Sequence, residues 1–155
     1  MPDKDLQIIY RRLDSIKILP QNAKDHDIGA ISLSFSKWGF VDPVGINETT
    51  GHDIDGNGRV EALAAMMRDK MPPPRGIKVD NDGMWLVPTV AGISMSEADE
   101  RRVALALNRM SELGGWHEDI LAKELAELIK QGEHMLEGVG WDAADVEEML
   151  ARIGP

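Results

Sequence analysis

The sequence predicts an α+β protein in which a mixed sheet with helices is followed by a wholly helical C-terminal segment. Two observations lead to this prediction. Short extended stretches alternate with amphipathic helical stretches over the first part of the chain, and three helical stretches with regular apolar spacing follow. We therefore expect two domains, residues 1–95 and residues 96–155.

The first elements are read from alternation and from capping residues. Residues 6–20 alternate apolar and polar side chains, which predicts one or two strands. A helix follows, with Asp27 as its expected N-cap and Gly39 just past its end. Two short extended segments, 41–47 and 52–54, come next.

The following helix is expected from about residue 57 to residue 70. Its apolar residues recur at the spacing i, i+3, i+4 and i+7 and so share one face; they are Val60, Leu63, Ala64 and Met67. The proline-rich stretch 71–76 ends this helix. Residues 77–93 then form a predicted hairpin with its turn at 81–83.

The C-terminal part is predicted to hold three helices. The first begins at Ser96, which with Asp99 forms a variant of the capping box, and the Gly-Gly-Trp sequence at 114–116 ends it. The second covers residues 117–132, and the third begins at Asp142.

Composition narrows the functional classes. A net charge of −10 excludes a broadly basic DNA-binding face, because phosphate contacts require Lys and Arg. Contact with DNA would need a local patch, and the candidates are Arg11, Arg12 and Lys17, the stretch 68–75, and Arg101 with Arg102. The absence of cysteine excludes disulfides and thiolate sites. With no membrane-spanning stretch and no signal peptide, we expect a cytoplasmic protein.

The stretch GHDIDGNGRVEALAAMM (51–67) has two interpretations, of which the first is a calcium loop. Counted from Asp53, it places oxygen ligands and a glycine where an EF-hand needs them. Position 12, however, is Ala64, which offers no ligand oxygen, and the chain before the loop is extended rather than helical. We therefore do not expect calcium binding.

The second interpretation is a phosphate site. The same residues read as a strand end, a Gly-Asn-Gly-Arg turn and a helix, and a helix N-terminus presents backbone N–H groups to an anion. Gly56 and Gly58 let a ligand approach the backbone closely. Arg59 in the first turn has the planar guanidinium that forks onto phosphate oxygens.

Three longer segments carry a family resemblance. They are SFSKWGFVDPV (34–44), DGNGRVEA (55–62) and NRMSELGGWHEDILAKELAEL (108–128). In this order they resemble the ParB/sulfiredoxin superfamily and, more narrowly, the stand-alone ParB-like nuclease proteins of phages and prophages. The resemblance implies a ParB/sulfiredoxin-like mixed sheet in residues 1–95 and a site for a nucleoside triphosphate, CTP or ATP, with Mg²⁺.

The same resemblance assigns roles to individual residues. Those implied in nucleotide binding are Asn22, Lys24, Gly56, Asn57, Gly58 and Arg59. Asp55 is the implied magnesium ligand, and Asp55 with Glu61 is the implied catalytic pair.

The chain departs from the family pattern in ways that leave its activity open. Asn57 stands where relatives often carry His, Cys or Glu, and an amide is neither a nucleophile nor a general base. Val60 follows Arg59 in place of a second arginine. Our leading hypothesis, which the resemblance implies, is a protein of a phage or mobile element that binds a nucleoside triphosphate with Mg²⁺ and acts in DNA metabolism, modification or defence. The alternatives are a metal-dependent nuclease or phosphotransferase of the same fold, and a non-catalytic interaction module.

The C-terminal helices are the expected contact with partners. Self-association into a homodimer and docking to a DNA-acting partner protein both remain open for residues 96–155. No contact with a membrane is expected.

Overall fold

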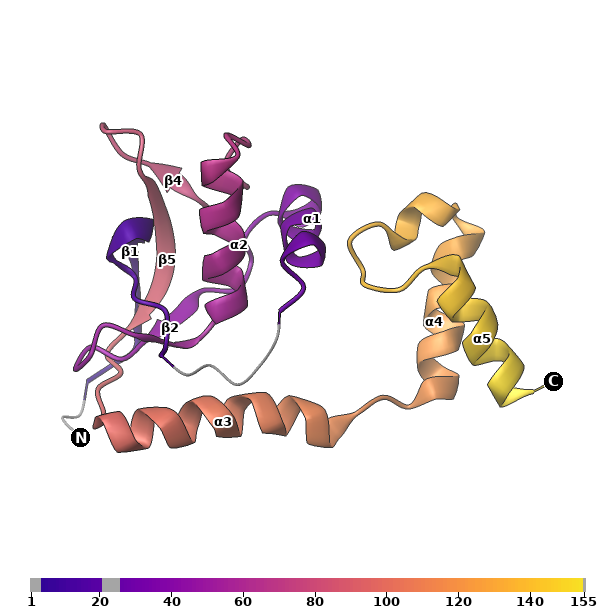
Figure 1. Cartoon of the computed structure of the whole chain (residues 1–155). Helices are drawn as coiled ribbons and strands as arrows, with labels where there is room; N and C mark the ends of the chain where they lie inside the picture. The colour runs from indigo at the N-terminus through magenta and orange to yellow at the C-terminus, as the bar shows by residue number, and fades with distance from the viewer. Residues whose placement is uncertain (1–3, 21–25, 155) are drawn as a thin grey trace. The chain divides into compact units, whose positions relative to one another are not determined.

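The computed structural model describes residues 4–20 and 26–154, and it confirms an α+β protein with a mixed sheet (Figure 1). The chain forms two compact units, Met1–Met110 and Ser111–Pro155. The elements in chain order are β1 (Gln7–Arg12), a 3₁₀ turn η1 (Leu13–Ser15), α1 (Ile28–Trp38), β2 (Val44–Ile46), β3 (Asp53–Asp55), α2 (Asn57–Arg68), β4 (Lys78–Val79), β5 (Trp85–Ala91), α3 (Glu97–Gly114), α4 (Glu118–Lys130), a second 3₁₀ turn η2 (Glu133–Leu136) and α5 (Ala143–Ile153).

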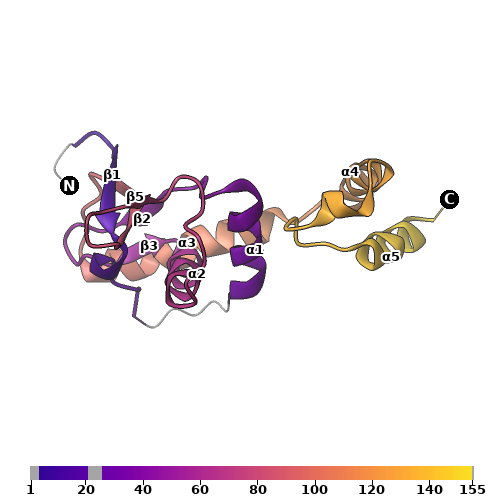
Figure 2. The same ribbon diagram turned by 90° about the horizontal axis from the view of Figure 1, so that it is seen from above.

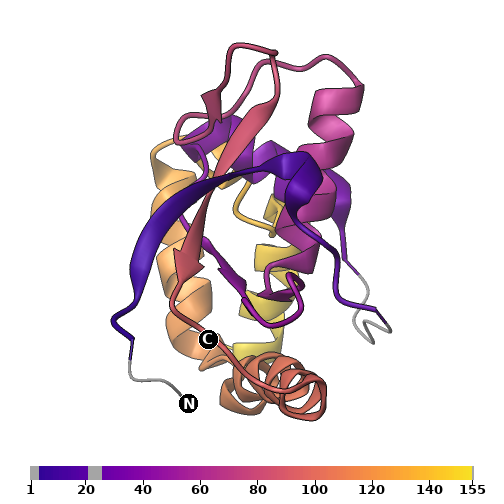
Figure 3. The ribbon, with the colours of Figure 1, turned by 90° about the vertical axis from the view of Figure 1, so that its left-hand side faces the viewer.

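The sheet of the first unit is built around β5. Its order is β1-β5-β2-β3, and β4 also pairs with β5. β1 and β4 run antiparallel to β5, β2 runs parallel to it, and β3 runs antiparallel to β2. In Figure 3 the indigo β1 crosses in front of the pink β5. The hairpin predicted at 77–93 is therefore confirmed as β4 and β5.

Helices α1 and α2 pack together and cover one face of this sheet, with α2 between the strands and α1 (Figures 1 and 2). The core joins apolar side chains from η1, both helices, β2 and β5: Leu13, Ile16, Phe35, Val44, Ile46, Val60, Leu63, Met66, Trp85 and Val87. This arrangement places the start of α2 at the end of β3, where the sequence predicts the phosphate site.

The buried face of α2 differs from the predicted one. Val60 and Leu63 are buried as expected, but Ala64 is exposed and Met66 takes the core position next along the helix. Because α2 contacts both the sheet and α1, its buried surface is wider than a single stripe. The stripe that included Ala64 was therefore wrong in part.

The predicted helix starts are confirmed by their caps. The Asp27 carboxylate accepts a hydrogen bond from the backbone N–H of Ala30 at 2.9 Å. Asp142 forms a complete capping box with Asp145 at the start of α5. Ser96 Oγ accepts from the N–H of Asp99 at 3.2 Å before α3.

Glu100 fastens the first turn of α3 to the loop between β2 and β3. Its carboxylate, 3% exposed, accepts hydrogen bonds from Asn47 Nδ2 at 3.0 Å and from the Thr50 hydroxyl, and it pairs with His52 Nδ1 at 3.0 Å. Burial alone would raise the pKa of Glu100, but hydrogen bonds from Thr50, His52 and Asn47 outweigh it and hold that pKa below its usual value. Both carboxylate oxygens of Glu100 are thus satisfied.

The second unit has a core of its own. Its buried residues come from α4, η2 and α5: Ala122, Leu125, Leu136, Val146 and Met149. The rings of Trp116 and Trp141 meet edge to face, with centroids 5.1 Å apart. The predicted domain boundary at 95/96 falls just before α3, whereas the two compact units divide at 110/111, within that helix.

None of the helices in the described part of the chain is both long and apolar enough to cross a membrane.

Candidate functional site

A cavity of about 270 Å³ opens at the N-terminus of α2. Its polar lining comes from the segment before α1, the loop after α1, β3, the first turn of α2 and α3: His26, Asp42, Asp53, Asp55, Asn57, Arg59 and Asn108. Gly56 and Gly58 also line it, beside the apolar Leu19, Ile31, Ile54, Ala104 and Leu107. The stretch at 51–67 is therefore the strand, turn and helix of the phosphate interpretation.

The first turn of α2 has backbone donors that find no acceptor among the described residues. Gly56 precedes the helix with φ 128°, a conformation that favours glycine, and it provides no side-chain cap. The N–H of Val60 bonds to the Gly56 carbonyl. Among residues 4–20 and 26–154, nothing accepts a hydrogen bond from the N–H groups of Asn57, Gly58 and Arg59. These donors and the positive end of the helix dipole suit an anion.

Arg59 is already engaged by the protein. Its Nη1 donates to the carbonyl of Asp42 at 3.0 Å and pairs with the Asp42 carboxylate. Its Nη2 donates to the carbonyl of Asp55 at 3.1 Å and lies 3.6 Å from the Asp55 carboxylate. The Arg59 side chain is only 15% exposed. A phosphate that binds this guanidinium must therefore compete with two aspartates.

Asp53 is a buried carboxylate with one unsatisfied oxygen. Its Oδ1 accepts from the backbone N–H of Leu19 at 3.0 Å, and the same N–H also reaches Asn57 Oδ1 at 3.1 Å. No donor in the described part of the chain reaches its Oδ2, and only 1% of the residue is exposed to solvent. Burial raises the pKa of Asp53 to about 6; the hydrogen bond from Leu19 opposes this rise, and Glu61 adds to it.

The structure brings only some of the predicted site residues together. Asp55 lines the cavity beside the four residues of the Gly-Asn-Gly-Arg turn. Glu61 does not line it, although its charge still acts on Asp53. Asn22 and Lys24 lie outside the described residues. The assigned roles of these residues stay predictions.

The four polar lining residues Asp53, His26, Asp42 and Asn108 were not among the predicted site residues. Asp53 had a usable signal, since alternation along a strand places it on the same face as Asp55. His26 packs against Gly58, where an added Cβ would lie 2.6 Å from its Nδ1, and nothing in the sequence indicates that contact. Asp42 and Asn108 come from elements far along the chain, so only the fold brings them to the turn.

The described residues offer only part of a ligand set for a metal ion at this site. No group of three His, Cys, Asp or Glu side chains within the described ranges is arranged to hold a metal ion. Mg²⁺, however, is often bound by one or two carboxylates together with substrate phosphates. Asp55, whose carboxylate is exposed, fits that kind of partial ligand set.

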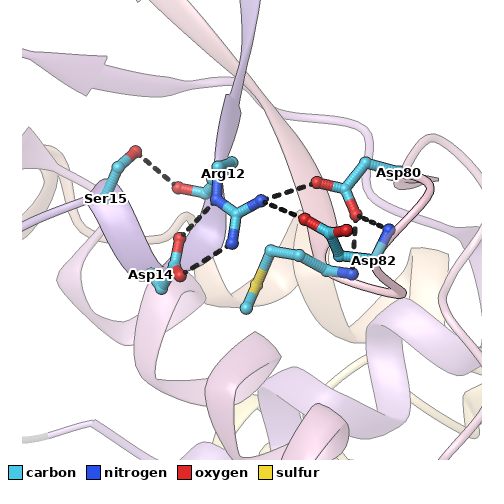
Figure 4. Close-up of polar contacts among 6 residues, drawn as sticks. Arg12, Asp14, Ser15, Asp80 and Asp82 are labelled. Atoms are coloured by element: carbon cyan, nitrogen blue, oxygen red, sulfur yellow. Dashed lines mark hydrogen bonds and ion pairs between the residues drawn. The ribbon is translucent and has the colours of Figure 1, made fainter.

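The candidate basic patches are largely neutralised. Arg12 is bound by carboxylates on both sides, with Asp14 at 3.1 Å and Asp80 at 2.8 Å, and Asp82 lies 3.5 Å away (Figure 4). Arg11 bonds to Thr89 Oγ1 at 3.1 Å. Arg68 and Arg102 also pair with acidic side chains, those of Asp69 and Asp99. These contacts give no support to direct DNA binding through the patches.

No protein-family profile matches the chain, and no curated protein sequence matches it significantly.

Proposed function

We propose that this protein binds a nucleoside triphosphate together with Mg²⁺, with the phosphates at the N-terminus of α2, as its resemblance to ParB/sulfiredoxin-like proteins implies. The observation that carries the proposal is the set of N–H groups of Asn57, Gly58 and Arg59 at the cavity, none of which has an acceptor within the described part of the chain. The turn sequence alone is a weak motif, and backbone donors beside a cavity support the proposal because such donors suit an anion.

The charges around the cavity explain why Mg²⁺ belongs to the proposal. Arg59 is offset by Asp42 and Asp55, and Asp53 adds a further carboxylate. A bare polyphosphate would meet excess negative charge here. A divalent cation held between Asp55 and the phosphate oxygens removes that repulsion. Binding of the triphosphate is therefore expected to require Mg²⁺.

A catalytic role has less support than binding. The implied acid pair is split, because Asp55 lines the cavity and Glu61 does not. Asn57 supplies no general base. A nuclease or phosphotransferase of this fold stays the alternative, and metal-dependent nicking of plasmid DNA that disappears in Asp55→Ala would favour it. The roles in DNA metabolism and in partner docking are carried by the resemblance alone.

The test is a titration of the full chain with CTP, ATP and GTP, each with Mg²⁺ and with EDTA. We expect saturable binding of at least one nucleotide with Mg²⁺, and binding about tenfold or more weaker in Arg59→Ala, since a charge-assisted contact is lost.

Arg68→Ala is the matched control. Arg68 ends the same helix, is exposed and forms an ion pair with its neighbour Asp69. Its removal should leave the affinity unchanged. If no nucleotide binds the unaltered protein in the presence of Mg²⁺, the proposed function is wrong.

A further inference from the structure

The α2 cavity combines two chemically opposite features. The first turn of α2, which lines it, offers three N–H donors, from Asn57, Gly58 and Arg59, that have no acceptor among residues 4–20 and 26–154 and suit an anion. Its lining also includes Asp53, whose Oδ2 is the only buried side-chain oxygen or nitrogen of the described residues that lacks a hydrogen-bond partner. A buried polar atom without a partner is rare in folded proteins and requires an explanation.

The unsatisfied oxygen of Asp53 limits which chemical groups of the ligand fit beside it. A fully ionised phosphate has only acceptor oxygens, so it does not supply the donor that Asp53 lacks. A Mg²⁺ ion keeps several water molecules, and the carboxylate of Asp55, which is 57% exposed, suits it better than the buried carboxylate of Asp53. A neutral hydroxyl or amino group of the ligand supplies such a donor without adding charge, and an ordered water molecule is the competing partner.

We propose that Asp53 accepts a hydrogen bond from a hydroxyl or amino group of the nucleoside part of the ligand, and that the cavity thereby selects a nucleoside triphosphate over a bare polyphosphate. This inference rests on the proposed function, because it assumes that phosphate occupies the start of α2. Asp53 is then a specificity-determining residue, and the Leu19 N–H fixes its orientation through Oδ1.

Two variants of Asp53 make the inference testable. Asp53→Asn keeps the shape of the side chain and removes its charge. Asp53→Ala removes both oxygens and still leaves the Leu19 N–H with a partner, since that N–H also lies 3.1 Å from Asn57 Oδ1. The second variant therefore does not orphan a backbone donor, and each variant checks the other for folding defects by circular dichroism.

The experiment compares two probes in the presence of Mg²⁺: the best-bound nucleoside triphosphate and inorganic tripolyphosphate, which has no hydroxyl or amino donor. We expect both Asp53 variants to bind the nucleotide about tenfold or more weakly, the usual scale for a hydrogen bond to a charged group, and to bind tripolyphosphate within about twofold of the unaltered protein. Asp55→Asn is the matched control, and it should weaken both probes alike.

The outcomes separate this inference from the proposed function. Equal losses of affinity for both probes in the Asp53 variants would mean that Asp53 acts on the phosphates or the metal. No loss for either probe would mean that Asp53 does not contact the ligand. Both results overturn the inference and leave nucleotide binding standing. If the unaltered protein binds no nucleotide, the proposed function fails and the inference fails with it. When the inference holds, a 2′,3′-dideoxynucleotide identifies the donor: the effect of Asp53→Asn vanishes for a ribose hydroxyl and persists for a base amino group.

Discussion

Glu100 and Asp53 are both buried carboxylates of the first unit, and their surroundings shift their pKa values in opposite directions. Glu100 meets Asn47, Thr50 and His52, and these contacts hold its pKa below the usual value. Asp53 receives one backbone N–H, has an oxygen without a partner among the described residues, and has a pKa raised to about 6.

The difference distinguishes a structural acid from a functional one. A buried carboxylate is compatible with a stable fold where hydrogen bonds replace the lost water, as those from Asn47, Thr50 and His52 do for Glu100. Asp53 lacks that compensation and lines the cavity at the start of α2. A residue that costs stability and faces a cavity is the kind retained for binding rather than for folding.

The largest expected effect comes from removing the compensated acid. Glu100→Ala should lower the free energy of unfolding by about 3 kcal/mol, because it leaves buried donors of Asn47 and Thr50 without their acceptor. Urea denaturation followed by circular dichroism measures this change. Glu97→Ala, at an exposed position in the same turn of α3, is the control and should change stability by less than about 0.5 kcal/mol. Similar changes in the free energy of unfolding for the two variants would contradict the structural role of Glu100.

Removing the uncompensated acid, Asp53, should raise the free energy of unfolding rather than lower it. The pKa of Asp53 rises from 3.8 to about 6 on folding, and a shift of this size corresponds to about 3 kcal/mol against the ionised form. Asp53→Asn should therefore raise the free energy of unfolding at pH 8 by about 2 kcal/mol, somewhat less than the full amount because the new amide is itself buried. Thermal and urea unfolding in EDTA measure it. A loss of stability at pH 8 would show that the Asp53 carboxylate is compensated after all.

The pH dependence sharpens the same contrast. Because the folded-state pKa of Asp53 is raised, ionisation of this carboxyl opposes folding. The resulting loss of stability is absent below about pH 4, grows as the pH rises and is complete above about pH 6 to 7. The advantage of Asp53→Asn over the unaltered protein should follow that window and vanish below about pH 4. Unfolding curves for both proteins at a series of pH values give the difference directly, and an advantage independent of pH would contradict the cause we assign.

The sequence predicted the elements better than the site. Alternation, caps and breakers located β5, α2 and α5 closely, because those signals are local. The Gly-Asn-Gly-Arg turn was placed correctly for the same reason. The pairing of Arg59 with Asp42 was not foreseeable, because it joins the loop after α1 to the start of α2 through the packing of the fold. The partners that distinguish Glu100 from Asp53 likewise lie about 50 and 34 residues away along the chain.

The smallest expected effect concerns a third carboxylate, that of Asp42, which is 71% exposed and occupies Arg59 in the absence of ligand. Asp42→Asn removes the competing charge and keeps the backbone carbonyl that also binds Arg59. Since an exposed ion pair is worth up to about 1 kcal/mol, the affinity for tripolyphosphate with Mg²⁺ should rise about two- to fivefold. Calorimetric titration of both proteins measures the ratio, and the gain should shrink in high salt because the pair is screened. A weaker affinity in Asp42→Asn would instead make this carboxylate part of the binding site, alongside Asp55 rather than in competition with the ligand.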